Sequence, residues 1–201
     1  MKRSAVLMLA PVLAIAQFHR AEQDREIRYW LLDPSTHQFR ISHDFNVTLP
    51  GQKSVHSFVR KGSSVAPDSK MFLLDTGEAL HTHFVTGKQV NALGYYPEPA
   101  EPDSVVVQGD LPREIEDGQS FRIRVEETYT DPVGYMMQDS ELVWARTLDR
   151  PLNYVTLPQG WMLTSVNTPA VVTLDAQGCV TLRFTNTHPG DLPVTIRARR
   201  R

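Results

Sequence analysis

The stretch FRIRVEE, residues 121–127, alternates apolar and charged side chains along the chain. Ile123 and Val125 fall on one side, whereas Arg122 and Arg124 fall on the other. Because successive side chains of a β-strand point to opposite faces, this period of two predicts a strand with one buried face. A strand of this kind suits an antiparallel sheet that has a core on one side and solvent on the other.

The same alternation recurs toward the C-terminus. The stretch VVTLDAQGCVTLRF (171–184) reads as two alternating strands around a turn at 175–178, in which Gly178 supplies the left-handed residue. A further alternating run, PVTIRAR, occupies 193–199. The spacing of strands and turns predicts an all-β chain with an antiparallel β-sandwich architecture.

A proline-rich segment divides the expected strands into two groups. The stretch GYYPEPAEPDS (94–104) has three prolines within six residues, and proline stiffens the chain and removes a backbone donor. We therefore expect two small immunoglobulin-like sandwiches at 17–94 and 104–201, joined by a linker at 95–103. One larger sandwich with a proline-rich loop is the alternative.

The N-terminal stretch MKRSAVLMLAPVLAIAQ has the three parts of a secretory signal peptide. Lys2 and Arg3 give a positive start, an apolar run follows, and Ala14 and Ala16 provide a small-x-small cleavage pattern. We expect residues 1–16 to be removed and the mature protein to be secreted or periplasmic. The apolar run is shorter than the roughly 20 residues that span a bilayer, and no transmembrane span is expected in the mature chain.

Charge and cysteine content narrow the range of expected partners and of covalent cross-links. The chain has 21 Lys and Arg against 23 Asp and Glu, a formal net charge of −2, so nucleic acid is not expected as a partner. Cys179 is the only cysteine, so no internal disulfide can form. Asn46 begins a glycosylation tripeptide, which matters only where the source glycosylates exported proteins.

The stretch MFLLDTG (71–77) resembles the active-site motif of aspartic proteases of the retroviral and pepsin types. That resemblance implies that Asp75 would share a proton with a second aspartate in a facing loop. A second Asp-Thr-Gly is absent, and Glu78 stands where the family has a small residue. A hairpin turn accounts for the same residues, with Asp75 opening the turn and Gly77 within it.

His81 and His83 are two residues apart and would face the same side of a strand. Two imidazoles in this arrangement can reach one metal ion, but a closed site needs about four ligands. His43 and His56 are possible further ligands, although nothing in the sequence brings them close. We expect no metal and no cofactor, and we assign no catalytic or binding residue.

These observations favour an exported, non-enzymatic protein with a binding or structural role at the cell envelope or outside the cell. Its expected partner is a protein or an envelope polymer. The general plan resembles that of periplasmic pilus chaperones, which also follow a signal peptide with two small sandwiches. Two alternatives stay open. The first is a hydrolase or metal-binding protein using Asp75 or His81 and His83. The second is an accessory subunit of a larger exported assembly. The His-Glu-x-x-His motif of zinc peptidases is absent.

Overall fold

The computed structural model describes residues 26–187 and 190–201. The expected signal peptide, residues 1–16, lies outside the described residues. The strands are β1 (Glu26–Leu31), β2 (Gln38–Val47), β3 (Ser54–Phe58), β4 (Ser64–Val65), β5 (Lys70–Leu73), β6 (His81–Thr86), β7 (Val105–Asp110), β8 (Phe121–Thr130), β9 (Tyr135–Gln138), β10 (Glu141–Leu148), β11 (Leu152–Thr156), β12 (Trp161–Val166), β13 (Val171–Leu174), β14 (Val180–Thr185) and β15 (Leu192–Arg200). A 3-10 turn, η1 (Pro34–Thr36), and a short helix, α2 (Gly87–Asn91), complete the elements.

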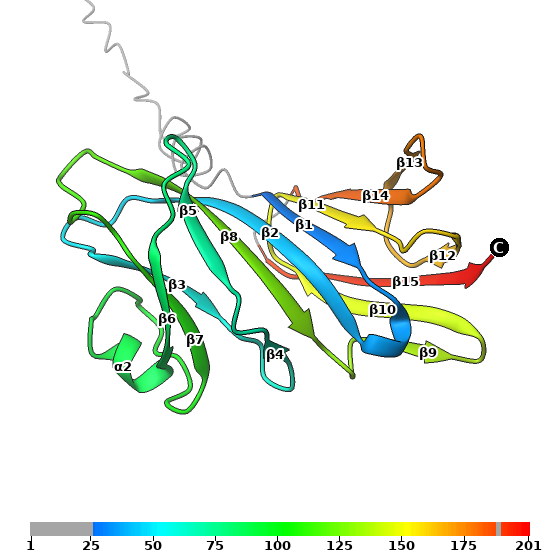
Figure 1. Ribbon diagram of the computed structural model, residues 1–201, viewed down its shortest axis with the longest axis horizontal. Coiled ribbons are helices and arrows are strands. Elements are labelled where there is room, and N and C mark those ends of the chain that lie inside the picture. The colour runs from blue at the N-terminus through cyan, green and yellow to red at the C-terminus, as the bar shows by residue number, and fades with distance from the viewer. Residues whose placement is uncertain (1–25, 188–189) are drawn as a thin grey trace, which may run out of the picture.

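An eight-stranded sheet runs through the whole molecule. Its order is β13-β14-β11-β1-β2-β8-β4, and β5 also pairs with β8. The long strands β2 and β8 pair along their full lengths and run from the end that holds β3, β6 and β7 past the middle of the molecule (Figure 1). Most pairs are antiparallel, as expected, but β1 and β11 run parallel. The all-β prediction is confirmed.

Two smaller sheets complete the layers at opposite ends of the molecule (Figure 1). A four-stranded sheet has the order β12-β15-β10-β9, and a three-stranded sheet has the order β3-β7-β6. We call the latter the small sheet. Helix α2 follows β6 directly and begins at a capping box, in which Thr86 and Gln89 satisfy each other's backbone amides. No helix among the described residues is long and apolar enough to cross a membrane.

The alternation read from the sequence matches the burial of these strands. Ile123 and Val125 of β8 are fully buried, and Leu182 and Phe184 of β14 are buried in the same way. The turn between β13 and β14 forms as predicted: the carboxylate of Asp175 accepts hydrogen bonds from the amides of two residues ahead of it, and Gly178 has a φ of 74°. The period of two therefore identified the buried faces correctly.

The apolar side chains form two clusters. One lies between the large sheet and the four-stranded sheet and includes Phe39, Trp144 and Ile196. The other lies between the large sheet and the small sheet and includes Met71 and Ile123. Strand β8 contributes to both clusters, so the molecule has two cores that share one continuous sheet.

The segment at 95–103 connects α2 to β7, and the sheet pairing does not divide there. Strand β2 precedes the segment and β8 follows it, yet the two strands pair along ten residues. Asn91 fastens the segment through two 2.8 Å hydrogen bonds with the backbone of Ala100. We still predict that proteolysis would begin at 95–103 and leave two resistant fragments.

Glu127 is an unusual member of the buried face of β8. It lies between Val125, which belongs to one core, and Tyr129, which belongs to the other. Its Oε2 accepts a 3.0 Å hydrogen bond from the hydroxyl of Ser57, while its buried Oε1 has no partner among the described residues. Burial raises the pKa of Glu127 to about 7, although the Ser57 bond acts in the opposite direction.

Candidate metal centre

The outer face of the small sheet carries a row of polar side chains. In the register of the sheet, His81 of β6 lies opposite Asp110 of β7, and His83 lies opposite Gln108. His56 of β3 lies opposite Gln108 from the other side. These residues occupy alternate positions, so all five point away from the core on the same face. The strand geometry alone therefore brings three histidines and a carboxylate to one surface.

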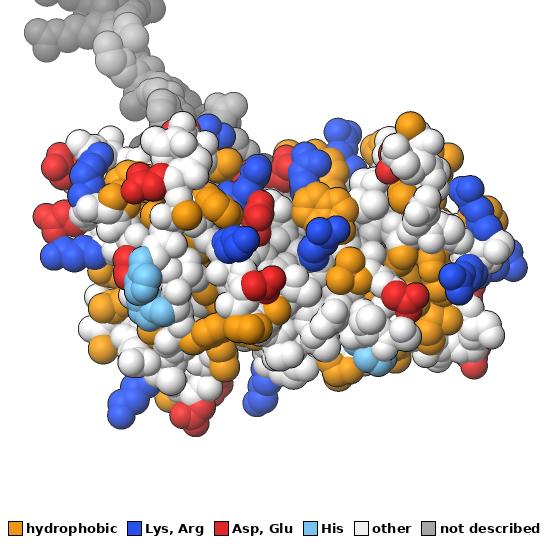
Figure 2. Space-filling view, in the orientation of Figure 1, with side chains coloured by type: hydrophobic (Ala, Val, Ile, Leu, Met, Phe, Trp, Pro, Cys, Tyr) orange, Lys and Arg blue, Asp and Glu red, His pale blue; other side chains and the backbone are white. Residues whose placement is uncertain are grey.

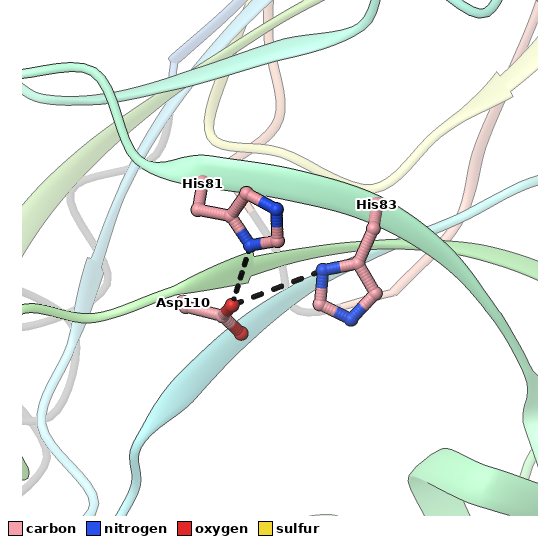
Figure 3. A group of neighbouring side chains, drawn as sticks. All are labelled: His81, His83 and Asp110. Carbon is pink, nitrogen blue, oxygen red and sulfur yellow. Dashed lines mark hydrogen bonds and ion pairs between the residues drawn. The ribbon is translucent and has the colours of Figure 1, made fainter.

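Three of these side chains converge closely (Figure 3). The Nδ1 of His81 lies 2.9 Å from Oδ2 of Asp110, and the Nδ1 of His83 lies 3.8 Å from the same oxygen. One potential ligand atom from each residue lies within 4.8 Å of the others. We call these three residues the His-His-Asp group.

The carboxylate at the centre of the group is held in its ionised form. Partial burial acts to raise the pKa of Asp110, but hydrogen bonds from His81 and Gln108 and the nearby imidazoles outweigh it, and the pKa is lowered. A carboxylate kept ionised beside two imidazoles has the charge that a cation requires.

His83 is the least satisfied member of the group. Its ring is partly exposed, but its Nδ1 is buried and makes no hydrogen bond among the described residues. The 3.8 Å separation from Asp110 is too long for a hydrogen bond. Buried polar atoms are nearly always hydrogen-bonded, whereas this nitrogen has only the longer contact with Asp110.

Two imidazoles and one carboxylate suit first-row transition metals such as zinc. In a tetrahedral zinc site with bonds of about 2.0–2.1 Å, donor atoms lie roughly 3.4 Å apart. The two separations from Asp110, 2.9 and 3.8 Å, lie on either side of that spacing, and all three ligand atoms lie within 4.8 Å of one another, so side-chain rotations can bring them onto one ion. One coordination position would remain for water or another molecule.

The sequence identified only part of this group. His81 and His83 do share one face, as predicted, but neither His43 nor His56 completes the group. His43 lies on β2 in the large sheet and accepts a 2.9 Å hydrogen bond from Arg150. Asp110 was missed because it lies 27 residues beyond His83, and only the pairing of β6 with β7 brings it near. The polar end of VVVQGD (105–110) was the one sequence signal available.

Asp75 lies in a surface turn, as the hairpin interpretation requires. The turn closes through a 2.8 Å hydrogen bond from the Gly77 amide to the Leu73 carbonyl, and Gly77 has a φ of 73°. The Asp75 carboxylate pairs with Arg122 at 3.2 Å. After the turn the strands separate, since β5 joins β8 and β6 joins β7.

The His-His-Asp group lies on open surface. The side chain of His81 is 77% exposed, and Figure 2 shows histidine side chains beside an acidic group over this end of the molecule. A hollow of about 500 Å³ lies elsewhere, over β1, β2 and β8, and is lined by Arg28, Trp30 and Arg124 among others. Another, of about 600 Å³, lies beside the connection from β3 to β4.

No family model matches the sequence, and no curated protein matches it. Solved structures match by fold. An M1 zinc metallopeptidase from Deinococcus radiodurans has a TM-score of 0.52 and 13% identity, covering 87% of this chain and 41% of that one. A mutant of the enzyme bound to a Tyr-Ser-Ala substrate gives a TM-score of 0.51 and 14% identity over the same shares. This chain thus spans about two fifths of those proteins, and the similarity is one of β-rich fold alone.

Proposed function

We propose that this chain is a non-catalytic β-sandwich binding protein that takes up one divalent transition-metal ion at the His-His-Asp group. The observation that carries the proposal is the buried Nδ1 of His83, which makes no hydrogen bond and lies 3.8 Å from an ionised carboxylate already bonded to a second imidazole. A metal ion would give this nitrogen the short bond that it lacks. It would also replace the proton that His81 shares with Asp110.

The exposure of the group favours binding over catalysis. Enzymes place a reactive metal where water is excluded, because low dielectric strengthens every charge interaction there. Here the His81 side chain is 77% exposed and the Asp110 side chain is 43% exposed. A metal ion in this position is better suited to holding the surface together or to accepting one more ligand from a partner.

Thermal melting of tag-free protein with and without zinc tests the proposal. Binding to the folded state alone should raise the melting temperature as zinc exceeds its dissociation constant. The double variant His81→Ala, His83→Ala should lose that zinc-dependent rise. His37→Asn is the matched control, because it removes a histidine distant from the group, and Asn tolerates the φ of 55° at this position. An equal zinc response in the double variant would refute the proposal.

We also propose that the protein is exported and acts at the cell envelope or outside the cell, with a protein or envelope polymer as its partner. The signal-peptide pattern of residues 1–16 supports export. Sequencing the N-terminus of protein from its native source should find a start at or near Gln17. An intact Met1 in a cytosolic fraction would overturn this proposal.

A role as an accessory subunit is a second candidate. It is supported by the fold similarity, in which this chain matches only about two fifths of the longer proteins. Size-exclusion chromatography of material from the native source should then find the chain in a complex well above its own 22.7 kDa. Elution as a monomer from the same source would argue against the accessory role.

A further inference from the structure

Strand β13 is the last strand at one edge of the large sheet, and its apolar side chains are uncovered. In the register with β14, Val172 lies opposite Leu182 and Leu174 lies opposite Val180. Leu182 and Val180 belong to the core between the large sheet and the four-stranded sheet. Val172 is nevertheless 48% exposed and Leu174 is 63% exposed. The core face of the sheet thus continues beyond the core as an exposed apolar strip.

Three consecutive arginines, Arg199, Arg200 and Arg201, lie at the same end of the molecule and are exposed. In the register of β12 with β15, Arg199 lies opposite Met162, whose side chain is 42% exposed. The amide of Arg201 donates a 2.9 Å hydrogen bond to the carbonyl of Gly160, in the turn before β12. The pairing of β12 with β15 therefore places an apolar side chain among the cations.

Arg201 joins the arginines to the apolar strip. A guanidinium nitrogen of Arg201 lies 3.5 Å from the point where a Cβ atom of Gly178 would stand, and Gly178 belongs to the turn that follows Leu174. Figure 1 shows β12, β13 and the last residues of β15 at one end of the molecule, and Figure 2 shows cationic side chains beside hydrophobic ones there. We call six residues the amphipathic end: Met162, Val172, Leu174, Arg199, Arg200 and Arg201.

The cations of the amphipathic end are not neutralised within the chain. None of its three arginines forms an ion pair among the described residues. Two acids nearby are held by their own turns. Hydrogen bonds from Ser35, and to a smaller extent the charge of Arg200, lower the pKa of Asp33. The carboxylate of Asp175 accepts hydrogen bonds from two backbone amides. The arginines can therefore meet negative charge from outside.

We propose that the amphipathic end binds the surface of an anionic lipid bilayer. The arginines contact lipid phosphates, while the three apolar side chains enter the boundary between headgroups and acyl chains. A soluble polyanion would satisfy the arginines but would leave Val172 and Leu174 in water, so the combination favours a lipid surface. The His-His-Asp group lies at the opposite end of the molecule, so this inference does not depend on the metal site (Figure 1).

The strength of such binding follows from its two parts. One arginine near an anionic membrane strengthens binding by about 5-fold. Removing the exposed surface of one leucine and one valine from water strengthens it by about 10-fold or more. Neither part alone anchors a protein stably, so we expect reversible binding that weakens as salt screens the charges.

Co-sedimentation of the full chain with vesicles tests the cationic part. Vesicles of phosphatidylcholine with about 30% phosphatidylglycerol should bind the chain more tightly than vesicles of phosphatidylcholine alone, and salt at about 0.5 M should release most of it. Replacing all three arginines of the amphipathic end with glutamine should weaken binding to the anionic vesicles by about 10-fold or more. The matched control carries Lys53→Gln, Lys61→Gln and Lys88→Gln, which remove the same charge beside the small sheet. It should bind like the natural chain.

A second pair of variants tests the apolar part. Val172→Thr with Leu174→Thr keeps residues that favour a strand but reduces the apolar surface, and it should weaken vesicle binding by about 10-fold. Val133→Thr is the control, because Val133 is 74% exposed in the turn between β8 and β9. Every variant retains the N-terminal apolar run, so differences among them report the amphipathic end. Unchanged melting temperatures would show that each variant folds.

Three outcomes would overturn the inference. The first is that the natural chain binds neither kind of vesicle, or binds both equally. The second is that binding to anionic vesicles survives replacement of the three arginines. The third is that the chain binds heparin, a soluble polyanion, while the Val172→Thr, Leu174→Thr variant binds vesicles like the natural chain. A chain that binds anionic vesicles as expected but binds no zinc would support this inference and refute the metal site.

Discussion

Asp110 and Glu127 are two carboxyl groups in the same half of the molecule, and their surroundings shift their pKa values in opposite directions. Asp110 lies on the outer face of the small sheet, where hydrogen bonds and imidazoles lower its pKa. Glu127 lies on the inner face of β8, where burial raises its pKa to about 7. The first is held ionised, while the second is ionised only in part near neutral pH.

This difference distinguishes a carboxyl group that can bind a metal ion from one that destabilises the fold. An ionised carboxylate that accepts hydrogen bonds on one side and is exposed on the other can bind a cation. A buried carboxyl with one hydroxyl partner and an unpaired oxygen destabilises the fold whenever it ionises. The two faces of the sandwich therefore serve different purposes, and substitutions on each face should have separable effects.

The largest effect is expected at Glu127. The folded pKa of about 7 exceeds the ordinary value of 4.5, so the folded state keeps a proton that the unfolded state has lost between those pH values. Stability should therefore fall as pH rises from about 4.5 to 7, by on the order of 3 kcal/mol in total. Glu127→Gln, followed by urea unfolding at pH 5 and pH 8, should remove most of this dependence.

Glu126→Gln is the matched control, because Glu126 lies next in the chain on the exposed face. Its pH dependence should stay close to that of the natural protein. Equal pH dependence in the natural chain and the Glu127→Gln variant would show that the buried carboxyl does not titrate as described.

Gly109 lies on the inner face of β7, between Gln108 and Asp110. A Cβ atom there would lie 2.6 Å from Sδ of Met71 and 3.3 Å from Cγ2 of Val55. Gly109→Ala should therefore destabilise the fold by about 2 kcal/mol through overpacking. Adding Met71→Val should restore part of the loss in chemical denaturation. Zinc binding on the opposite face should persist, and its complete loss would show that the faces are not independent.

The turn at 74–79 lies where the chain leaves the large sheet for the small one. Gly77 has a φ of 73°, a conformation that a β-branched residue rarely adopts. Gly77→Val should therefore destabilise the protein by on the order of 1 kcal/mol or more in thermal or chemical unfolding. A neutral result would mean that the turn adjusts without strain.

The smallest effect is expected at Asp75. Its ion pair with Arg122 joins side chains that are 62% and 58% exposed, so solvent screens most of the attraction. Asp75→Asn should change the free energy of unfolding by less than about 0.5 kcal/mol. A catalytic Asp75 would instead leave the fold intact while a proteolytic activity disappeared, which an assay with a generic peptide substrate would detect.

The sequence predicted local structure well because local structure depends on nearby residues. The alternation in FRIRVEE located the buried face of β8, and the same period places Glu127 on that face. The turn chemistry of Asp175 and Gly178 predicted the hairpin correctly. The burial of Glu127 could have been read from the same pattern by extending the alternation two residues further.

Long-range pairing could not be read in this way. Nothing in the sequence indicates that β2 pairs with β8 across the proline-rich segment, or that β1 runs parallel to β11. The His-His-Asp group depends on such a pairing, because β6 and β7 must lie in register before Asp110 reaches His81. The sequence therefore identified two of its ligands, and the polar end of VVVQGD (105–110) did not by itself place the third beside them.

The most direct measurement is the anomalous diffraction of crystals grown with zinc, collected at the zinc absorption edge. We expect one strong peak about 2.0–2.2 Å from Nδ1 of His81, Nδ1 of His83 and a carboxylate oxygen of Asp110. The peak should vanish in crystals of the His83→Ala variant. Crystals with no zinc peak at this position, or with a peak coordinated by other residues, would show that the His-His-Asp group is not a metal site.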